Sequence, residues 1–145
     1  MTHRALGAAG ALAGLLILGA CASGSPAAGA AEDLTGREWI AREIDGQVVM
    51  DNAQSTLLFE STDRIVGDTA CNRYFGSWEV DGERITLGPL GSTRRACAPE
   101  VMDQESRFLS ALEQAATWAL DADGCLYLSD ADGAVLVRLC RAGGM

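Results

Sequence analysis

Short runs in which apolar and polar residues alternate occupy the chain from residue 34 to about residue 87. A period of two is typical of strands that bury one face, and the Asp81-Gly82 pair between two such runs favours a tight hairpin turn. Pro89 interrupts the alternation, and we expect the sheet pattern to end there. The pattern predicts strands at residues 37–44, 47–50, 56–60, 64–68, 77–80 and 83–87.

Strict alternation also assigns the two faces of the first of these runs. It places Trp39 and Ala41 on one face, and it places Ile40, Arg42 and Ile44 on the other.

Residues 99–117 carry the one pattern with a helical period. Pro99 suits the first turn of a helix, and Glu100 and Asp103 follow where the helix dipole favours negative charge. Residues spaced three and four positions apart form one face of this helix, and we predict that this face packs on the sheet. Its members are Val101, Met102, Glu105, Phe108, Leu109, Leu112 and Ala116.

Glu105 is the one charged residue on that apolar face. It either lies at the edge of the face and reaches water, or it is a partly buried carboxylate paired with an arginine. Burial without a partner would cost several kcal/mol, so the second arrangement requires the pairing.

The last third of the chain repeats Asp-Ala-Asp-Gly, at residues 121–124 and at 130–133. Calcium needs six or more oxygen ligands, and these quartets lack the spacing and the distal glutamate of an EF-hand. Asp and Gly are ordinary turn formers, so we expect turns and no metal site. Strand-like runs flank the turns at residues 117–120, 125–129 and 134–140, and Leu126, Leu128, Val135, Val137 and Leu139 share a face.

The N-terminus has the pattern of a lipoprotein signal peptide. An uncharged apolar run ends in Leu18-Gly19-Ala20-Cys21, and it is shorter than the roughly 20 residues that a permanent membrane helix needs. We expect a signal peptide over residues 1–20, acyl chains on Cys21 and a flexible tether over residues 21–33. The membrane is therefore an expected partner through Cys21, and Ala22 favours the periplasmic face of the outer membrane.

Charge and composition exclude several function classes. The chain has 20 acidic residues, 11 basic residues that are all arginine, and one histidine, His3. A chain that begins at Cys21 loses Arg4 and is strongly acidic, which argues against nucleic acid as a partner. Without His3 it lacks histidine-based triads and histidine-ligated zinc, and without lysine it lacks Schiff-base chemistry. Paired carboxylates are the catalytic arrangement left open.

Four cysteines lie beyond the lipobox, and an even number in an exported domain predicts two disulfides. If residues 130–133 turn the final hairpin, one allowed register places Cys125 directly opposite Cys140. That leaves Cys71 with Cys97. A redox pair is the competing interpretation, but no Cys-x-x-Cys is present, and we expect structural bridges.

Several ordered motifs resemble the META domain family of HslJ-type envelope proteins. Residues 67–78 read Gly-Asp-Thr-Ala-Cys-Asn-Arg-Tyr-Phe-Gly-Ser-Trp, and residues 92–97 read Ser-Thr-Arg-Arg-Ala-Cys. The opening at residues 34–39 is similar to the family's Leu-x-Gly-x-x-Trp, and Glu105 stands three residues before an aromatic, as in the family. One departure is Ala70, where the family usually has glycine.

The resemblance covers residues 34–141 and implies one α+β domain. In such a domain a curved antiparallel sheet or open barrel of short strands carries one main helix. The family is associated with envelope stress and has no established catalytic residues. We therefore expect a non-enzymatic, monomeric envelope lipoprotein without a cofactor, which acts in envelope stress or maintenance through an envelope protein partner.

An interaction patch is predicted around the junction of Cys71 and Cys97, because arginines beside aromatics are typical interface anchors. The alternative is that an arginine of this set neutralises Glu105, that the aromatics belong to the core and that Asn72 holds a turn. The patch would contain Asn72, Arg73, Tyr74, Trp78, Arg94 and Arg95.

A second functional hypothesis is a carrier or sensor of a small apolar ligand held between sheet and helix. It requires a cavity lined by Leu58, Phe59, Phe108 and Leu112.

Overall fold

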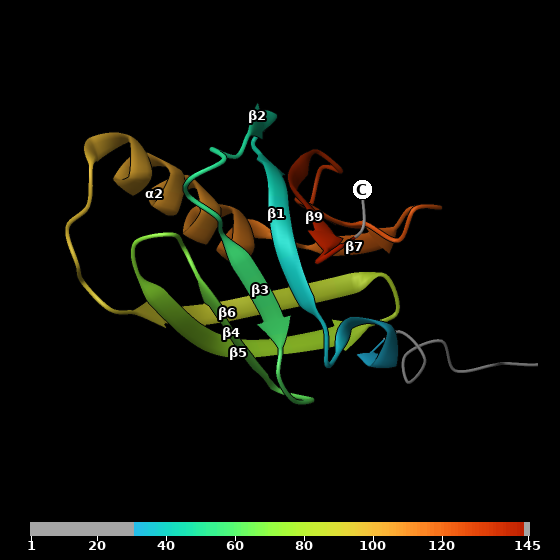
Figure 1. The fold of residues 1–145 in the computed structure, drawn as a ribbon. Coiled ribbons are helices and arrows are strands. Elements are labelled where there is room, and N and C mark those ends of the chain that lie inside the picture. The colour runs from blue at the N-terminus through green and yellow to red at the C-terminus, as the bar shows by residue number, and fades with distance from the viewer. Residues whose placement is uncertain (1–30, 144–145) are drawn as a thin grey trace, which may run out of the picture.

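The computed structural model describes residues 31–143. Within this range nine strands form one antiparallel sheet, which curls until β1 pairs with β9, and helix α2 packs on it (Figure 1). The expected α+β fold with a curved antiparallel sheet and one main helix is confirmed. The elements are β1 (Glu38–Ile44), β2 (Gln47–Val48), β3 (Thr56–Phe59), β4 (Arg64–Asp68), β5 (Arg73–Asp81), β6 (Arg84–Ser92), α2 (Pro99–Gln114), β7 (Thr117–Leu120), β8 (Leu126–Ser129) and β9 (Val135–Arg141).

The expected signal peptide, Cys21 and most of the expected tether lie outside the described residues. The end of that tether, residues 31–33, belongs instead to a short helical turn over residues 31–34. Leu34 is fully buried and Ala31 packs against the core, so the folded part begins a few residues earlier than the polarity of this stretch indicates.

Ile44 was assigned to the wrong face of the first strand. A bulge between Ala41 and Glu43, where β1 pairs with β9, shifts the alternation by one residue. Trp39, Ala41 and Ile44 are therefore all buried on the same side.

Pro89 does not end the sheet, contrary to the expectation, because β6 continues to Ser92. Opposite this proline, β5 pairs Gly76 with Leu90 and Trp78 with Leu87, so Ser77 alone faces two residues. Such a bulge tolerates a residue that has no N–H to donate. The Ser77 hydroxyl donates a hydrogen bond of 2.7 Å to the Gly88 carbonyl and fastens the two strands there.

Helix α2 is shorter than predicted, because it ends at Gln114 and Thr117 already belongs to β7. The backbone of Ala115 is extended, and the Ala116 N–H donates to the Ser129 carbonyl of β8. Pairing of these residues with the sheet therefore replaces the last predicted turn of the helix.

The final hairpin has one of the expected registers, with Leu126 opposite Leu139 and Leu128 opposite Val137. A bulge at Ser129 then turns Val135 outward, where it is 50% exposed, although alternation assigned it to the buried face. Leu136 is buried instead.

The two Asp-Ala-Asp-Gly quartets form nearly identical turns. Oδ1 of Asp121 accepts hydrogen bonds from the N–H groups of Asp123 and Cys125, both of 2.9 Å. Oδ1 of Asp130 accepts the same two bonds from Asp132 and Ala134, also of 2.9 Å. The first aspartate of each quartet thus accepts hydrogen bonds from N–H groups of its own turn, as expected if the quartets are turns.

We predict that Asp121→Asn makes the free energy of unfolding less dependent on pH in the acid range. The N–H of Cys125 lowers the pKa of Asp121, so its charged form stabilises the fold above its ordinary pKa, and this contribution is lost as the pH falls through the lower folded value. Asparagine keeps the acceptor oxygen and does not titrate. Urea unfolding from about pH 6 to about pH 2 should show the stability difference between wild type and variant shrinking toward acid. If the difference in the free energy of unfolding between wild type and variant does not change with pH, the stabilising role of the charged Asp121 is contradicted.

Candidate functional site

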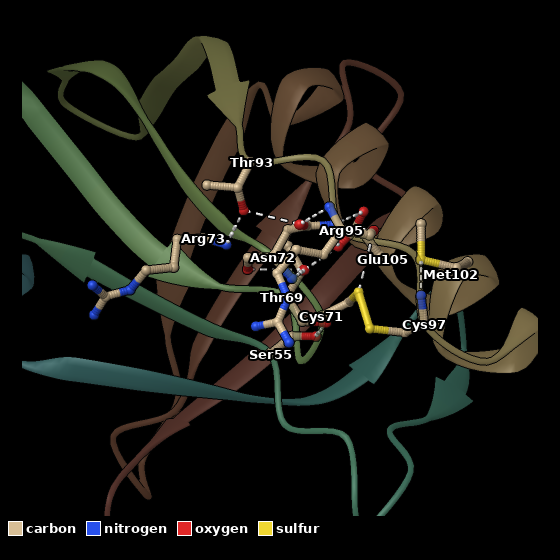
Figure 2. The surroundings of a disulfide bond; sticks show 10 residues. All are labelled: Ser55, Thr69, Cys71, Asn72, Arg73, Thr93, Arg95, Cys97, Met102 and Glu105. Carbon is tan, nitrogen blue, oxygen red and sulfur yellow. Dashed lines mark hydrogen bonds between the residues drawn. A yellow bond between two sulfur atoms is a disulfide. The ribbon is translucent and has the colours of Figure 1, made fainter.

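Three segments that are distant in sequence meet beside the Cys71–Cys97 disulfide (Figure 2). They are the turn between β4 and β5 at residues 69–72, the segment between β6 and α2 at residues 93–98, which we call the strap, and the first half of helix α2. All residues of the strap are exposed, whereas Thr69, Asn72 and Glu105 beneath it are buried.

Glu105 is a buried carboxyl group, 7% exposed, whose partners come from the turn. The Asn72 amide lies 3.0 Å from both carboxyl oxygens, and the Thr69 hydroxyl donates a short hydrogen bond to one of them. The predicted burial of Glu105 is confirmed, but the predicted arginine partner is wrong, because no arginine is paired with Glu105 within residues 31–143. The helix carries the group inward, and neutral donors satisfy it there.

The side chain of Asn72 connects all three segments. Besides Glu105 on α2, its Nδ2 donates to the Arg95 carbonyl at 3.1 Å. Its Oδ1 accepts hydrogen bonds from the Arg95 N–H at 2.7 Å and from the Thr93 hydroxyl at 2.9 Å. Both donors and both acceptor positions of the amide are therefore used. This confirms a structural role for Asn72, within a turn, as one of the alternatives expected.

The turn itself is closed by Thr69, whose N–H donates to the Asn72 carbonyl at 2.8 Å and whose hydroxyl accepts from the Asn72 N–H at 2.9 Å. Ala70 has a φ of +82°, a conformation that glycine adopts readily and alanine does not. The glycine that is usual in the family at this position thus has a physical reason.

The two disulfides join Cys71 to Cys97 and Cys125 to Cys140, as predicted. Their Cα–Cα distances are 6.0 Å and 4.3 Å respectively. The first attaches the strap to the turn, next to the hydrogen bonds of Asn72, and the second crosses from the start of β8 to the end of β9.

The predicted patch of arginines and aromatics does not exist as one surface. Tyr74 and Trp78 are each 2% exposed and belong to the core. Their polar atoms are satisfied inside, because Tyr74 donates to the Thr56 carbonyl at 2.6 Å and Trp78 to the Ser61 carbonyl at 2.7 Å. Burial also raises the pKa of Tyr74 well above its ordinary value. Asn72 is buried as well.

What remains outside is three exposed arginines, Arg73, Arg94 and Arg95, and the side chain of Arg73 extends away from the strap (Figure 2). Arg73 at the start of β5 is hydrogen-bonded through its backbone to Thr93 of the strap, so the two segments adjoin. The Arg73 guanidinium lies 3.5 Å from the Asp68 carboxylate in an exposed pair, which is weak by nature.

The residues proposed to line a ligand cavity do not lie together. Phe59, Phe108 and Leu112 are fully buried members of the hydrophobic core, while Leu58 points to the opposite face of β3. Leu58 instead borders an outer groove of about 400 Å³ with Val66 and Phe75. Among the described residues this geometry gives the carrier hypothesis no support.

Gln104 is a buried polar residue that pattern analysis missed. Its Nε2 donates to the Ala53 carbonyl at 2.6 Å, and its Oε1 accepts from the Met50 N–H at 3.0 Å, so α2 holds the loop after β2. Gln104 lies four residues before Phe108 and therefore on the same face of the helix, and this spacing could have identified it as a buried residue. Through Ser55, which donates to the Thr69 carbonyl at 3.3 Å, this contact adjoins the network of Glu105.

This arrangement fixes backbone segments relative to one another. Within residues 31–143 no three histidine, cysteine, aspartate or glutamate side chains gather in a way that would hold a metal ion. In the same range, no helix is long and apolar enough to cross a membrane.

Comparison with known proteins identifies the family. The META domain model matches residues 32–143, most of the chain. This chain belongs to the META domain family. Membership indicates an envelope-related protein and places the chain in a family not known for enzymes. None of the curated proteins matches.

Solved structures show the same fold as this META protein. An NMR structure of a protein from Burkholderia xenovorans is 24% identical, with a TM-score of 0.60, and the match covers 96% of this chain and 98% of that one. A second NMR structure, also 24% identical with a TM-score of 0.60, covers 74% of this chain and 92% of its own.

Replacement of Ala70 by glycine should stabilise the domain by about 1 kcal/mol, because it removes the cost of alanine in a left-handed conformation. Chemical denaturation measures the change. Ala131→Gly is the matched control, because Ala131 lies in an exposed turn without a positive φ, and there glycine should not stabilise. Equal effects of the two substitutions would contradict the explanation.

Replacement of Glu105 by glutamine should lower the free energy of unfolding by about 1–3 kcal/mol. The new NH₂ group faces the donors of Thr69 and Asn72, so a buried donor loses its acceptor. Glu113→Gln, at an exposed position on the same helix, should change stability by less than about 0.5 kcal/mol. Urea denaturation of both variants tests the difference, and two equal small effects would show that the network is not required.

Proposed function

We propose that this META protein is a lipid-anchored, non-enzymatic envelope protein that recognises an acidic surface of another envelope protein. The observation that carries the proposal is the group of exposed arginines, Arg73, Arg94 and Arg95, on adjoining segments of a chain that is otherwise acidic. The partner, the anchor and a role in envelope stress or maintenance are all parts of this proposal.

The backbone that carries the arginines is held firmly, which favours recognition. Arg95 is bound through both its N–H and its carbonyl to the buried amide of Asn72, and Arg73 is bound to Thr93. A guanidinium on a fixed backbone loses less freedom on binding, and its planar fork matches a carboxylate with two hydrogen bonds. Carboxylates of a partner are therefore the chemistry that this surface suits.

The composition and the site support a role without catalysis. The chain has one histidine, His3, which lies in the expected signal peptide, and it has no lysine. Glu105, the buried carboxyl group of the site, is engaged by Thr69 and Asn72 and lies beneath the strap.

The anchor is inferred from the lipobox that ends at Cys21. Nine residues lie between Cys21 and Ala31, and the ten residue steps from one to the other reach about 35 Å at full extension. This length would allow the arginine group to meet a neighbouring envelope protein while the acyl chains stay in the membrane. Ala22 favours the outer membrane as the site of attachment.

The test is a native mass spectrum of the full-length protein extracted from membranes in mild detergent. We expect an acyl mass on Cys21 and a bound protein that is largely lost in the double variant Arg94→Gln/Arg95→Gln. The matched control is Arg64→Gln/Arg84→Gln, which removes the same charge at exposed positions away from the strap and should retain the partner. Retention of the partner by both variants would contradict the assigned surface.

Other outcomes separate the parts of the proposal. A missing acyl mass would overturn the anchor, and a small bound molecule in place of a protein would favour the carrier hypothesis. A bare acylated monomer would contradict the proposed partner.

A further inference from the structure

The two disulfides of this domain differ in their access to solvent. Cys125 and Cys140 are each 1% exposed. Cys71 is 7% exposed, whereas Cys97 is an exposed residue of the strap (Figure 2). A reagent in solution therefore meets an exposed residue at one end of the first bridge and a buried residue at both ends of the second.

The two bridges also differ in what must open before they can be reached. Cys140 lies in β9 opposite Ile40 of β1, at the pairing that closes the sheet into a ring. Exposure of Cys140 requires β9 to separate from β1. Cys97 belongs to no helix or strand, so its exposure requires no loss of regular structure.

We propose that the Cys71–Cys97 bridge is a site of thiol–disulfide exchange with an envelope dithiol, with Cys97 as the attacked residue. A thiolate of the dithiol attacks Sγ of Cys97 and forms a mixed disulfide, while the bond to Cys71 breaks and Cys71 leaves as the thiolate. The second thiol of the dithiol, as its thiolate, then attacks the sulfur of its own molecule and releases Cys97. Two electrons pass from the dithiol to the bridge, the dithiol becomes a disulfide, and both cysteines end as thiols.

Burial directs the attack to Cys97, because Cys71 lies beneath the strap. Its Sγ is 3.4 Å from the Arg95 carbonyl, which covers it on one side. The Cys97 N–H donates to the sulfur of Met102 at 3.4 Å, and a thioether sulfur is a weak acceptor.

The fold is arranged to survive this exchange. Asn72 holds the strap at Arg95 and Thr93 by three hydrogen bonds that do not involve sulfur. Exchange thus removes the covalent attachment of the strap and leaves its hydrogen bonds to Asn72 and Arg73. This inference requires neither the membrane anchor nor the arginine partner of the proposed function.

The experiment treats the full-length wild-type protein with reduced glutathione or dithiothreitol under native conditions. Samples are quenched with acid, alkylated and analysed peptide by peptide, and the buried bridge of the same chain is the internal control. Cys71 and Cys97 should become alkylated roughly tenfold faster than Cys125 and Cys140, or more, while the near-ultraviolet circular dichroism stays native. Early samples treated with glutathione should carry its mass on the peptide of Cys97.

The inference is overturned if both bridges open at one rate, if glutathione is found first on Cys71, or if no cysteine reacts before the domain unfolds. A second variant tests the claim that the fold survives. Cys71→Ala/Cys97→Ala should retain the native spectrum, and a failure to fold would contradict exchange in the folded domain.

Discussion

The side-chain amide of Asn72 is the interaction on which the rest of this site depends. It contributes two donors and two acceptor positions, and these bind the strap at Thr93 and Arg95 and the helix at Glu105. A buried amide with one unmet hydrogen bond is costly, so each partner is required by the others. The turn, the strap and helix α2 therefore hold their positions as one unit.

Much of the fold could be predicted from alternation and turn chemistry, and the exceptions share one cause. Ile44 and Val135 were assigned to the wrong face, and Pro89 was expected to end a strand, because a bulge interrupts the sheet near each of them. A bulge places two residues against one on the neighbouring strand. The position of a bulge depends on how two strands pair. It cannot be predicted from the alternation of apolar and polar residues within a single strand.

The candidate site was predicted less well, because its contacts cross between elements. Tyr74 was included in the predicted patch because it stands beside arginines in the sequence, but β5 begins at Arg73 and its pleat turns Tyr74 inward. The helical pattern identified Glu105 as a charged group on an apolar face. It could not identify Thr69 and Asn72 as its partners, because their short side chains reach it only once the sheet has curled.

The pairing of β1 with β9 joins the beginning of the domain to its end, with Trp39 opposite Arg141. Chain synthesis proceeds from the N-terminus to the C-terminus, so the first strand to emerge waits for the last before the ring can close. During that interval Trp39, Ile44 and Leu57, all fully buried in the finished domain, have no complete core to enter. The topology thus leaves these apolar side chains without a complete core until the last strand has emerged.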